Sequence, residues 1–215
     1  PLYYTEWNTS SNSRDLLHDR PYAAAVVVKT MLEANGLVEG YSFWAFTDVF
    51  AENYYASVPF HGGFGLLNLH GIPKPTYSAF LILHRLGTEL LPVEGSHATV
   101  DCWVARGERD TTVVLTNHAL PRHPIALQVV RIQLEGVPAA PRSVTIARID
   151  EDHANPYRAW TGMGSPEYLS PAAVSALEAD ALLSPTPFPC TREGGSLHLE
   201  VALPPHAVAA IVLER

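Results

Sequence analysis

The hydrophobic pattern changes near Leu90, and this change divides the chain into two kinds of structure. Up to about Gly87, strand-like apolar runs alternate with helix-like runs. Beyond Leu90, short runs in which apolar and polar residues alternate are separated by Gly, Pro and Asn. The first pattern is typical of a parallel sheet with helices outside it, and the second of a β-sandwich. We therefore predict an α/β domain over residues 1–88 and an all-β domain over residues 89–215.

Two strands and two helices are expected in the first domain. The strands cover Leu2–Glu6 and Gly40–Phe46, which are apolar and aromatic as in buried parallel strands. The first helix spans Asp19–Gly36, because its first residue can cap a helix and its last suits a left-handed stop. The second helix spans Pro75–Leu86, with a proline in its first turn and Gly87 as its stop. The order strand, helix, strand, helix predicts part of a parallel sheet.

The second domain is expected to contain short strands interrupted by one helix. The helix covers Ser170–Leu182, because Ser170 can cap it and Pro171 fits its first position. The strand-like runs are residues 100–104, 111–116, 125–134, 144–149, 197–203 and 207–213. Many short strands between turn residues favour a sandwich.

Composition excludes several classes of protein. A formal net charge of -8 argues against a nucleic-acid partner, because binding phosphates needs clustered Lys and Arg. We expect no membrane partner, since the sequence has no apolar run long enough to span a bilayer. Cys102 and Cys190 form no Cys-x-x-Cys motif, and we expect two reduced, mostly buried thiols.

Glu6 stands where the first strand opens into a polar run, the position at which barrel enzymes place their chemistry. A carboxylate there can attack a sugar carbon, but glycoside hydrolysis needs two carboxylates. The alternative is a strand-end carboxylate that holds a backbone amine or an Arg. A catalytic partner should come from an earlier strand, and the chain contains none. We therefore expect the chain to be the C-terminal part of a larger enzyme.

Three further segments have both a functional and a structural interpretation. Trp44 is either a core residue or the flat floor under a sugar ring. His61-Gly62-Gly63 lacks the context of a phosphate-binding loop, so the glycines are expected to permit a tight backbone path. The run Asp150–His153 matches neither a calcium loop nor a zinc motif. We expect this run to form a hydrogen-bonded loop that packs the sandwich against the barrel. We expect no metal and no cofactor in the protein.

Several motifs, in the expected order and through nearly the whole chain, resemble family 39 glycoside hydrolases. That family holds β-xylosidases and α-L-iduronidases. The motifs are Thr5–Ser10, Phe43–Phe50, Pro59–Asn68, Ile72–Pro75, Arg148–Tyr157 and Gly164–Leu169.

The resemblance implies the C-terminal part of a (β/α)8 TIM barrel followed by a β-sandwich, with Leu2–Glu6 as strand seven and Gly40–Phe46 as strand eight. It implies Glu6 as the nucleophile of a retaining enzyme. The acid/base Glu belongs to an Asn-Glu-Pro motif that this sequence lacks. We therefore expect the fragment alone to be inactive and to require the missing N-terminal barrel half. The expected substrate-binding residues are Trp44, Glu52, Asp48 and His61.

The expected substrate is a neutral glycoside, a terminal β-D-xyloside of a xylo-oligosaccharide. No Arg or Lys occurs between Asp48 and Gly71, where a uronide carboxylate would need a cation. An α-L-iduronidase-like hydrolase and a non-catalytic carbohydrate-binding or scaffold module are the alternatives. We also expect the isolated chain to form a homo-oligomer, to aggregate or to be associated with the missing barrel half, because a cut barrel exposes a strand edge. A cytoplasmic location is favoured.

Overall fold

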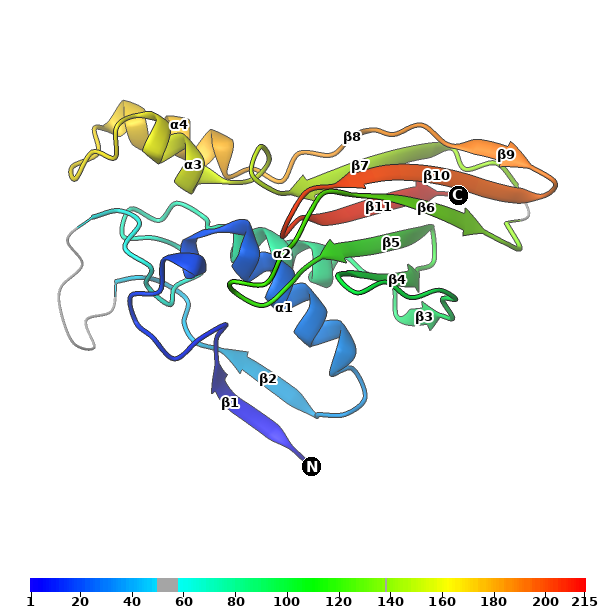
Figure 1. Cartoon of the computed structure of the whole chain (residues 1–215), viewed down its shortest axis with the longest axis horizontal. Coiled ribbons are helices and arrows are strands. Elements are labelled where there is room, and N and C mark those ends of the chain that lie inside the picture. Colours follow the sequence, from blue (N-terminus) through cyan, green and yellow to red (C-terminus); the bar gives the residue numbers. More distant parts are fainter. Residues whose placement is uncertain (50–57, 138) are drawn as a thin grey trace.

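The computed structural model describes residues 1–49, 58–137 and 139–215. Near the N-terminus, β1 (Tyr3–Trp7) and β2 (Gly40–Phe43) pair in parallel. A short 3-10 helix, η1 (Leu16–Asp19), and the helix α1 (Pro21–Glu33) connect them. The helix α2 (Pro75–His84) follows the segment after β2 and packs against α1. In Figure 1 this group forms the lower part of the molecule, with β1 and β2 at its outer edge.

The second part contains two sheets that face one another. The larger sheet has the order β3-β4-β5-β11-β7-β8, and the smaller has the order β6-β10-β9. The larger is built from β3 (Glu89–Leu91), β4 (Val100–Arg106), β5 (Asp110–Asn117), β7 (Ser143–Ile149), β8 (Thr186–Pro187) and β11 (Val208–Glu214). The smaller is built from β6 (Gln128–Leu134), β9 (Thr191–Glu193) and β10 (Ser196–Leu203).

Strand alternation gives the large sheet two buried faces. On β5, Val113 and Leu115 pack with Leu199 of the small sheet in one cluster. Val114, between them, packs with α1 and α2 in a second cluster. Successive side chains of a strand point to opposite faces, so one sheet joins the core between the sheets to the helices. The strands β1 and β2 reach this second cluster only through partly buried aromatic side chains, among them Trp7 and Phe43.

Two helices lie between β7 and β8 and return to the first part of the chain. They are α3 (Pro156–Gly162) and α4 (Pro171–Asp180), at the upper left of Figure 1. Trp160 of α3 and Leu177 of α4 share a buried cluster with Phe60 and Ile72. The helices α3 and α4 therefore pack against the segment that follows β2.

The structure corrects several sequence predictions. Asp19 does not cap α1; Arg20 holds that position without a side-chain cap. Only one helix was expected between the late strands, yet α3 precedes α4, with Asn155 as its cap. Gly87 does not have the positive φ of a left-handed stop. A Cβ on Gly87 would lie 2.1 Å from the Arg106 carbonyl carbon, so close backbone approach requires glycine there.

The strand β1 is mostly exposed and β2 is only partly buried, in contrast to their apolar sequences. Leu2 is 51% exposed, Tyr3 61% and Tyr4 47%. The only strand partner of β1 among the described residues is β2. Aromatic side chains on both faces of β1 are therefore open to solvent.

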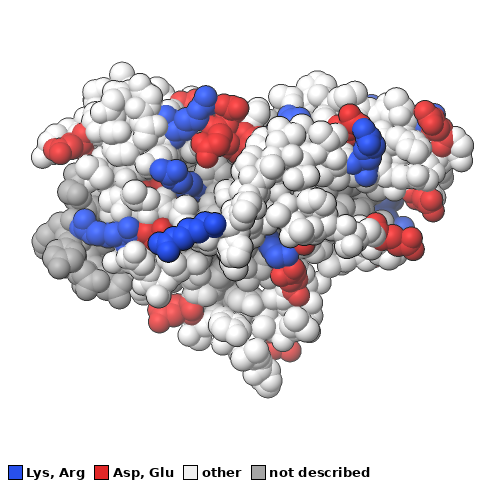
Figure 2. All heavy atoms as spheres, in the orientation of Figure 1, with Lys and Arg blue, Asp and Glu red and all other residues white. Residues whose placement is uncertain are grey.

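No described helix is long and apolar enough to cross a membrane. On the face drawn in Figure 2, acidic and basic side chains are interspersed over both parts of the molecule. Some exposed charges of the molecule are paired, such as Arg131 with Glu200 across β6 and β10 at 2.7 Å.

Candidate active site

The candidate active site lies at the carboxyl ends of β1 and β2. Because these strands are parallel, their carboxyl ends meet at the same edge. Glu6, on β1, is exposed to solvent. Trp44 directly follows β2 and is 37% exposed. The Trp44 amide donates to the Trp7 carbonyl at 2.9 Å, which holds the indole-bearing residue beside the strand end that carries Glu6.

Asn8 joins the two strand ends through its side chain. Its amide nitrogen donates to the Trp44 carbonyl and, at 3.1 Å, to the Phe64 carbonyl. Its side-chain oxygen accepts from the Thr9 amide at 2.7 Å. No role was predicted for Asn8 from the sequence, although it stands two residues after Glu6 in the Thr5–Ser10 motif.

A second segment, residues 61–67, runs beside the chain that leaves β2. The Ala45 amide donates to the Phe64 carbonyl at 3.0 Å, and the Leu66 amide donates to the Ala45 carbonyl at 3.0 Å. The Asp48 amide donates to the Leu67 carbonyl at 2.8 Å. These bonds fix segment 61–67 against the residues that follow Trp44.

A buried ionic cluster lies under segment 61–67. The Lys74 ammonium contacts the Asp19 carboxylate at 2.6 Å and the Asp48 carboxylate at 2.7 Å, and all three side chains are 0% exposed. Burial raises the pKa of the Asp48 carboxyl, although the positive charge of Lys74 opposes this effect. Lys74 precedes Pro75 at the start of α2, Asp19 precedes α1, and Asp48 follows β2.

The glycines of segment 61–67 are required by close contacts. A Cβ on Gly63 would lie 2.3 Å from the Asp48 carboxylate, and one on Gly65 would lie 2.3 Å from the Asp48 amide nitrogen. Gly62 has a φ of +78°, and a Cβ there would lie 2.5 Å from the Asp15 backbone. The tight backbone path predicted for Gly62 and Gly63 is confirmed, and Gly65 shares it.

The histidine beside this path is held by protein groups. His61 is half-buried, and its Nδ1 lies 3.2 Å from the Val58 carbonyl. A second histidine, His18, is buried. Its Nδ1 lies 2.9 Å from the Gly62 carbonyl, and its Nε2 lies 3.1 Å from the Ser10 hydroxyl. Burial lowers the pKa of His18, which favours the neutral imidazole.

The predicted site residues differ in their position and burial. Glu6 and Trp44 lie together at the strand ends, and His61 lies on the neighbouring segment. Asp48 was expected to contact substrate, but it is buried, and its two oxygens bind Lys74 and the Gly65 amide. The prediction that Asp48 contacts substrate is therefore wrong, and its carboxylate instead holds the backbone at Gly65. Glu52 lies outside the described residues. No site role was predicted from the sequence for Asn8, Lys74 or Asp19; Asp19 was expected only as a helix cap.

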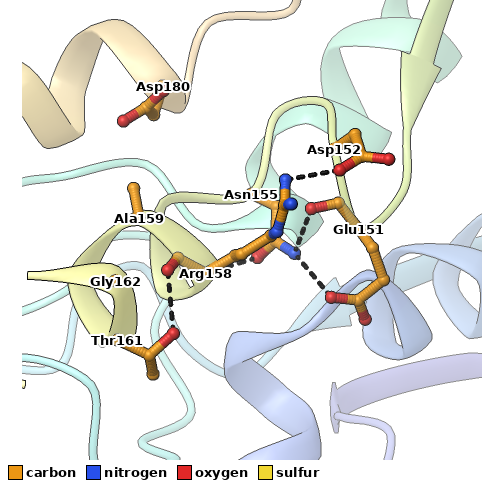
Figure 3. Close-up of a pocket in the computed structure, with 8 residues that line it drawn as sticks. All are labelled: Glu151, Asp152, Asn155, Arg158, Ala159, Thr161, Gly162 and Asp180. Atoms are coloured by element: carbon orange, nitrogen blue, oxygen red, sulfur yellow. Dashed lines mark hydrogen bonds and ion pairs between the residues drawn. The ribbon is translucent and has the colours of Figure 1, made fainter.

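A cavity of about 550 Å³ lies elsewhere, between the 150–155 loop, α3 and α4 (Figure 3). It is lined by carboxylates, including Glu151, Asp152 and Asp180, and by Arg158, which is paired with Asp152. The Asn155 side chain bridges to Glu151. Arg158 and Asn155 thus bind Asp152 and Glu151, and none of the lining residues belongs to β1 or β2.

The loop 150–153 is hydrogen-bonded, as predicted. Asp150 accepts from the Asp152 amide at 2.9 Å and lies 2.7 Å from His153 Nδ1. The next residue, Ala154, is buried in the cluster that joins the large sheet to α1 and α2. Across residues 1–49, 58–137 and 139–215, no group of three or more His, Cys, Asp or Glu is arranged to hold a metal ion. Cys102 and Cys190 are both free thiols.

The family profile described as glycosyl hydrolases family 39 matches residues 1–191. The chain belongs to glycosyl hydrolase family 39. Its resemblance to that family in six separate motifs is thus supported over nearly the whole sequence.

Named relatives agree with this family assignment. The chain is 42% identical to a β-xylosidase of Caldicellulosiruptor saccharolyticus over 218 residues, which cover 100% of this chain and 44% of that protein. It is 33% identical to a β-xylosidase of Geobacillus stearothermophilus, covering 100% of this chain and 42% of that protein. The crystal structure of a family 39 enzyme from Xanthomonas axonopodis pv. citri matches with a TM-score of 0.84 and 26% identity, over 100% of this chain and 44% of that one. The chain therefore spans less than half the length of these relatives.

Proposed function

We propose that this chain supplies the nucleophile of a retaining glycoside hydrolase that releases xylose from the ends of β-xylo-oligosaccharides. The observation that carries the proposal is that Glu6 is exposed on β1 and Trp44 is exposed at the end of β2, the strand paired in parallel with β1, in a family 39 chain. The names of two relatives, both β-xylosidases, support the substrate class.

In the proposed mechanism, the Glu6 carboxylate attacks the anomeric carbon of the terminal sugar. A protonated carboxylic acid on the opposite side donates its proton to the departing glycosidic oxygen. The resulting glycosyl ester on Glu6 is then hydrolysed by water, which the second carboxylate activates. Retention requires the two carboxyl groups to lie about 5–5.5 Å apart.

The acid/base Glu is proposed to come from residues that precede this part in its relatives. The relatives are more than twice as long as the span that they share with this chain. We propose that β1 and β2 are strands seven and eight of a (β/α)8 barrel and that the two facing sheets form its β-sandwich. The other barrel part would cover the exposed side chains of Tyr3 and Tyr4, and the chain alone would be inactive.

The substrate preference follows from the charges near the strand ends. Trp44 offers an exposed indole on which a sugar ring can stack. The sequence between Asp48 and Gly71 has no cation that could pair with a uronide carboxylate. Glu6 would repel such a carboxylate, so a neutral pentoside fits better. Glu52 is proposed to accept hydrogen bonds from sugar hydroxyls, and His61 to face the substrate.

The test is Glu6→Gln in the full-length protein, meaning this chain with all residues encoded ahead of it. Amide replacement removes the nucleophile but keeps its shape, so hydrolysis of an aryl β-xyloside should fall by at least about 1,000-fold. Glu94→Gln, at an exposed position far along the chain, is the matched control and should keep the wild-type rate.

Three outcomes would overturn parts of the proposal. Near wild-type turnover by the Glu6→Gln variant would remove Glu6 as nucleophile. Preference of the wild-type enzyme for an aryl α-L-iduronide would replace the substrate class. Binding of xylo-oligosaccharides without hydrolysis of either substrate would indicate a non-catalytic carbohydrate-binding module.

A further inference from the structure

We infer that Lys74 is a positioning residue of this active site, acting with Asp19 and Asp48 through the backbone of segment 61–67. The inference rests on the proposed function for its catalytic consequence. Its structural part stands on contacts that involve neither Glu6 nor a sugar. Lys74 is 0% exposed, so it acts through other groups and not by touching substrate.

Each member of the ionic cluster holds one backbone group of segment 61–67. The Gly62 amide donates to Asp19 at 2.6 Å, and the Gly65 amide donates to Asp48 at 2.7 Å. The Gly63 carbonyl accepts from the Lys74 ammonium at 2.9 Å. Three charged side chains thus fix three backbone groups within four residues. Such charge-assisted hydrogen bonds are stronger than neutral ones.

The fixed segment then reaches the strand ends through Phe64, which lies between the anchored glycines. The Phe64 carbonyl accepts from the Ala45 amide at 3.0 Å and from the Asn8 side chain at 3.1 Å. Asn8 also donates to the Trp44 carbonyl. A displacement of segment 61–67 would therefore move both Asn8, two residues after Glu6, and the backbone of Trp44.

Stability alone is a weak reason for the presence of these charges. Taking ions out of water is costly, and packed apolar residues often replace buried ion pairs without loss of stability. The cluster carries two carboxylates and one ammonium, so its charges do not cancel when all are ionised. What it provides is directional bonding to backbone groups that an apolar side chain would leave unpaired.

The experiment compares Lys74→Met and the milder Asp48→Asn with Leu199→Ala in the full-length protein. Leu199 lies in the core between the two sheets, so its truncation lowers stability away from the site. Amide hydrogen exchange is measured on peptides covering residues 1–10 and 58–67. The kcat and KM for an aryl β-xyloside are measured at a temperature where every variant is folded.

We expect faster exchange in both peptides for Lys74→Met and Asp48→Asn, and wild-type exchange there for Leu199→Ala. The kcat of Lys74→Met should fall about 10- to 100-fold with KM changed less than about threefold, because misplacement of a reacting group mainly lowers the chemical step. Asp48→Asn should show a smaller loss in the same direction, and Leu199→Ala should keep the wild-type kcat.

Unchanged exchange in the 58–67 peptide of both cluster variants would overturn the inference, whatever the activity. So would faster exchange with an unchanged kcat in an enzyme that Glu6→Gln inactivates. If Lys74→Met fails to fold, the same criteria apply to Asp48→Asn. If the wild-type protein hydrolyses no glycoside, the proposed function fails, and hydrogen exchange alone then decides whether the cluster holds segment 61–67.

Discussion

The ammonium group of Lys74 lies 2.7 Å from the carboxylate of Asp48, and neither side chain is exposed to solvent. This contact joins the start of α2 to the segment that follows β2. The same contact helps to hold segment 61–67, and that segment is hydrogen-bonded to the backbone at the strand ends that carry Glu6 and Trp44.

Removing the charge of Lys74 should be far more costly than removing a surface charge. Lys74→Met leaves two buried carboxylates without a cation and should lower the free energy of unfolding by about 3–5 kcal/mol. Arg131→Met breaks an exposed pair with Glu200 and should cost less than about 1 kcal/mol. Urea denaturation of the full-length protein measures both values. Equal costs would show that Lys74 is not held as described.

Gly65 should tolerate no side chain. A Cβ there would lie 2.3 Å from the Asp48 amide nitrogen and 2.4 Å from the Thr47 carbonyl carbon, so the backbone must shift. We expect Gly65→Ala to cost about 2–4 kcal/mol. Gly162→Ala is the control, since nothing lies within 4 Å of a Cβ at that position, and it should be neutral or slightly stabilising. Similar denaturation midpoints for the two variants would contradict the close approach at Gly65.

Protonation of His118 at acid pH should weaken the contact between α1 and the sheets. Burial, together with the smaller effect of His206, lowers the pKa of His118 to about 4. Both rings pack on Tyr22 of α1, at 5.3 and 5.1 Å. Lys29, Asp101 and Glu33 are the other charged groups whose fields reach His118.

Because the folded pKa lies below the unfolded value of 6.5, the unfolded state binds more protons between these values. The contribution of His118 to stability is therefore complete above pH 6.5 and is lost as the pH falls toward 4. His118→Asn should lose less stability between pH 7 and 4.5 than wild type, by about 1–2 kcal/mol. His123→Asn, at an exposed position, should follow the wild-type curve. Identical pH dependence in all three proteins would exclude this role for His118.

The isolated chain should self-associate through the exposed strand β1. Leu2, Tyr3 and Tyr4 are each about half exposed or more, and exposed apolar strands pair with other chains. Light scattering after size exclusion should show species larger than a monomer. Tyr3→Lys should reduce them, whereas Tyr168→Lys, at a residue 89% exposed on the α3–α4 connection, should not. A monodisperse monomer of the unmodified chain would contradict this expectation.

Local patterns in the sequence predicted most helices and strands. Ser170 caps α4 as its sequence indicates, with a hydrogen bond from the Ala173 amide at 3.2 Å. Alternation correctly located β4 and β10, because each strand buries one face against the core between the sheets. The short helix α3 was missed although Asn155-Pro156 is a typical helix start.

Long-range partners could not be predicted from such patterns. Asp19 has the sequence context of a helix cap, yet its carboxylate binds Gly62 and Lys74, which lie 43 and 55 residues further along the chain. Asp48 stands on a polar loop, and only the folded chain shows that its carboxylate is enclosed. The family motifs indicated Glu6 and Trp44, but local sequence gives no signal for the hydrogen bonds from Asn8 to the Trp44 and Phe64 carbonyls.

The most direct test of the central claim is covalent trapping of the nucleophile. The full-length protein is incubated with a 2-deoxy-2-fluoro-β-xyloside that carries a good leaving group, and the labelled peptide is identified by mass spectrometry. The fluorine slows hydrolysis of the glycosyl ester, so a retaining enzyme accumulates it. We predict one fluoroxylosyl group on Glu6 and none in the Glu6→Gln variant. A label on a different carboxylate, or turnover of ordinary aryl β-xylosides with inversion at the anomeric carbon, would contradict the assignment of Glu6 as the nucleophile.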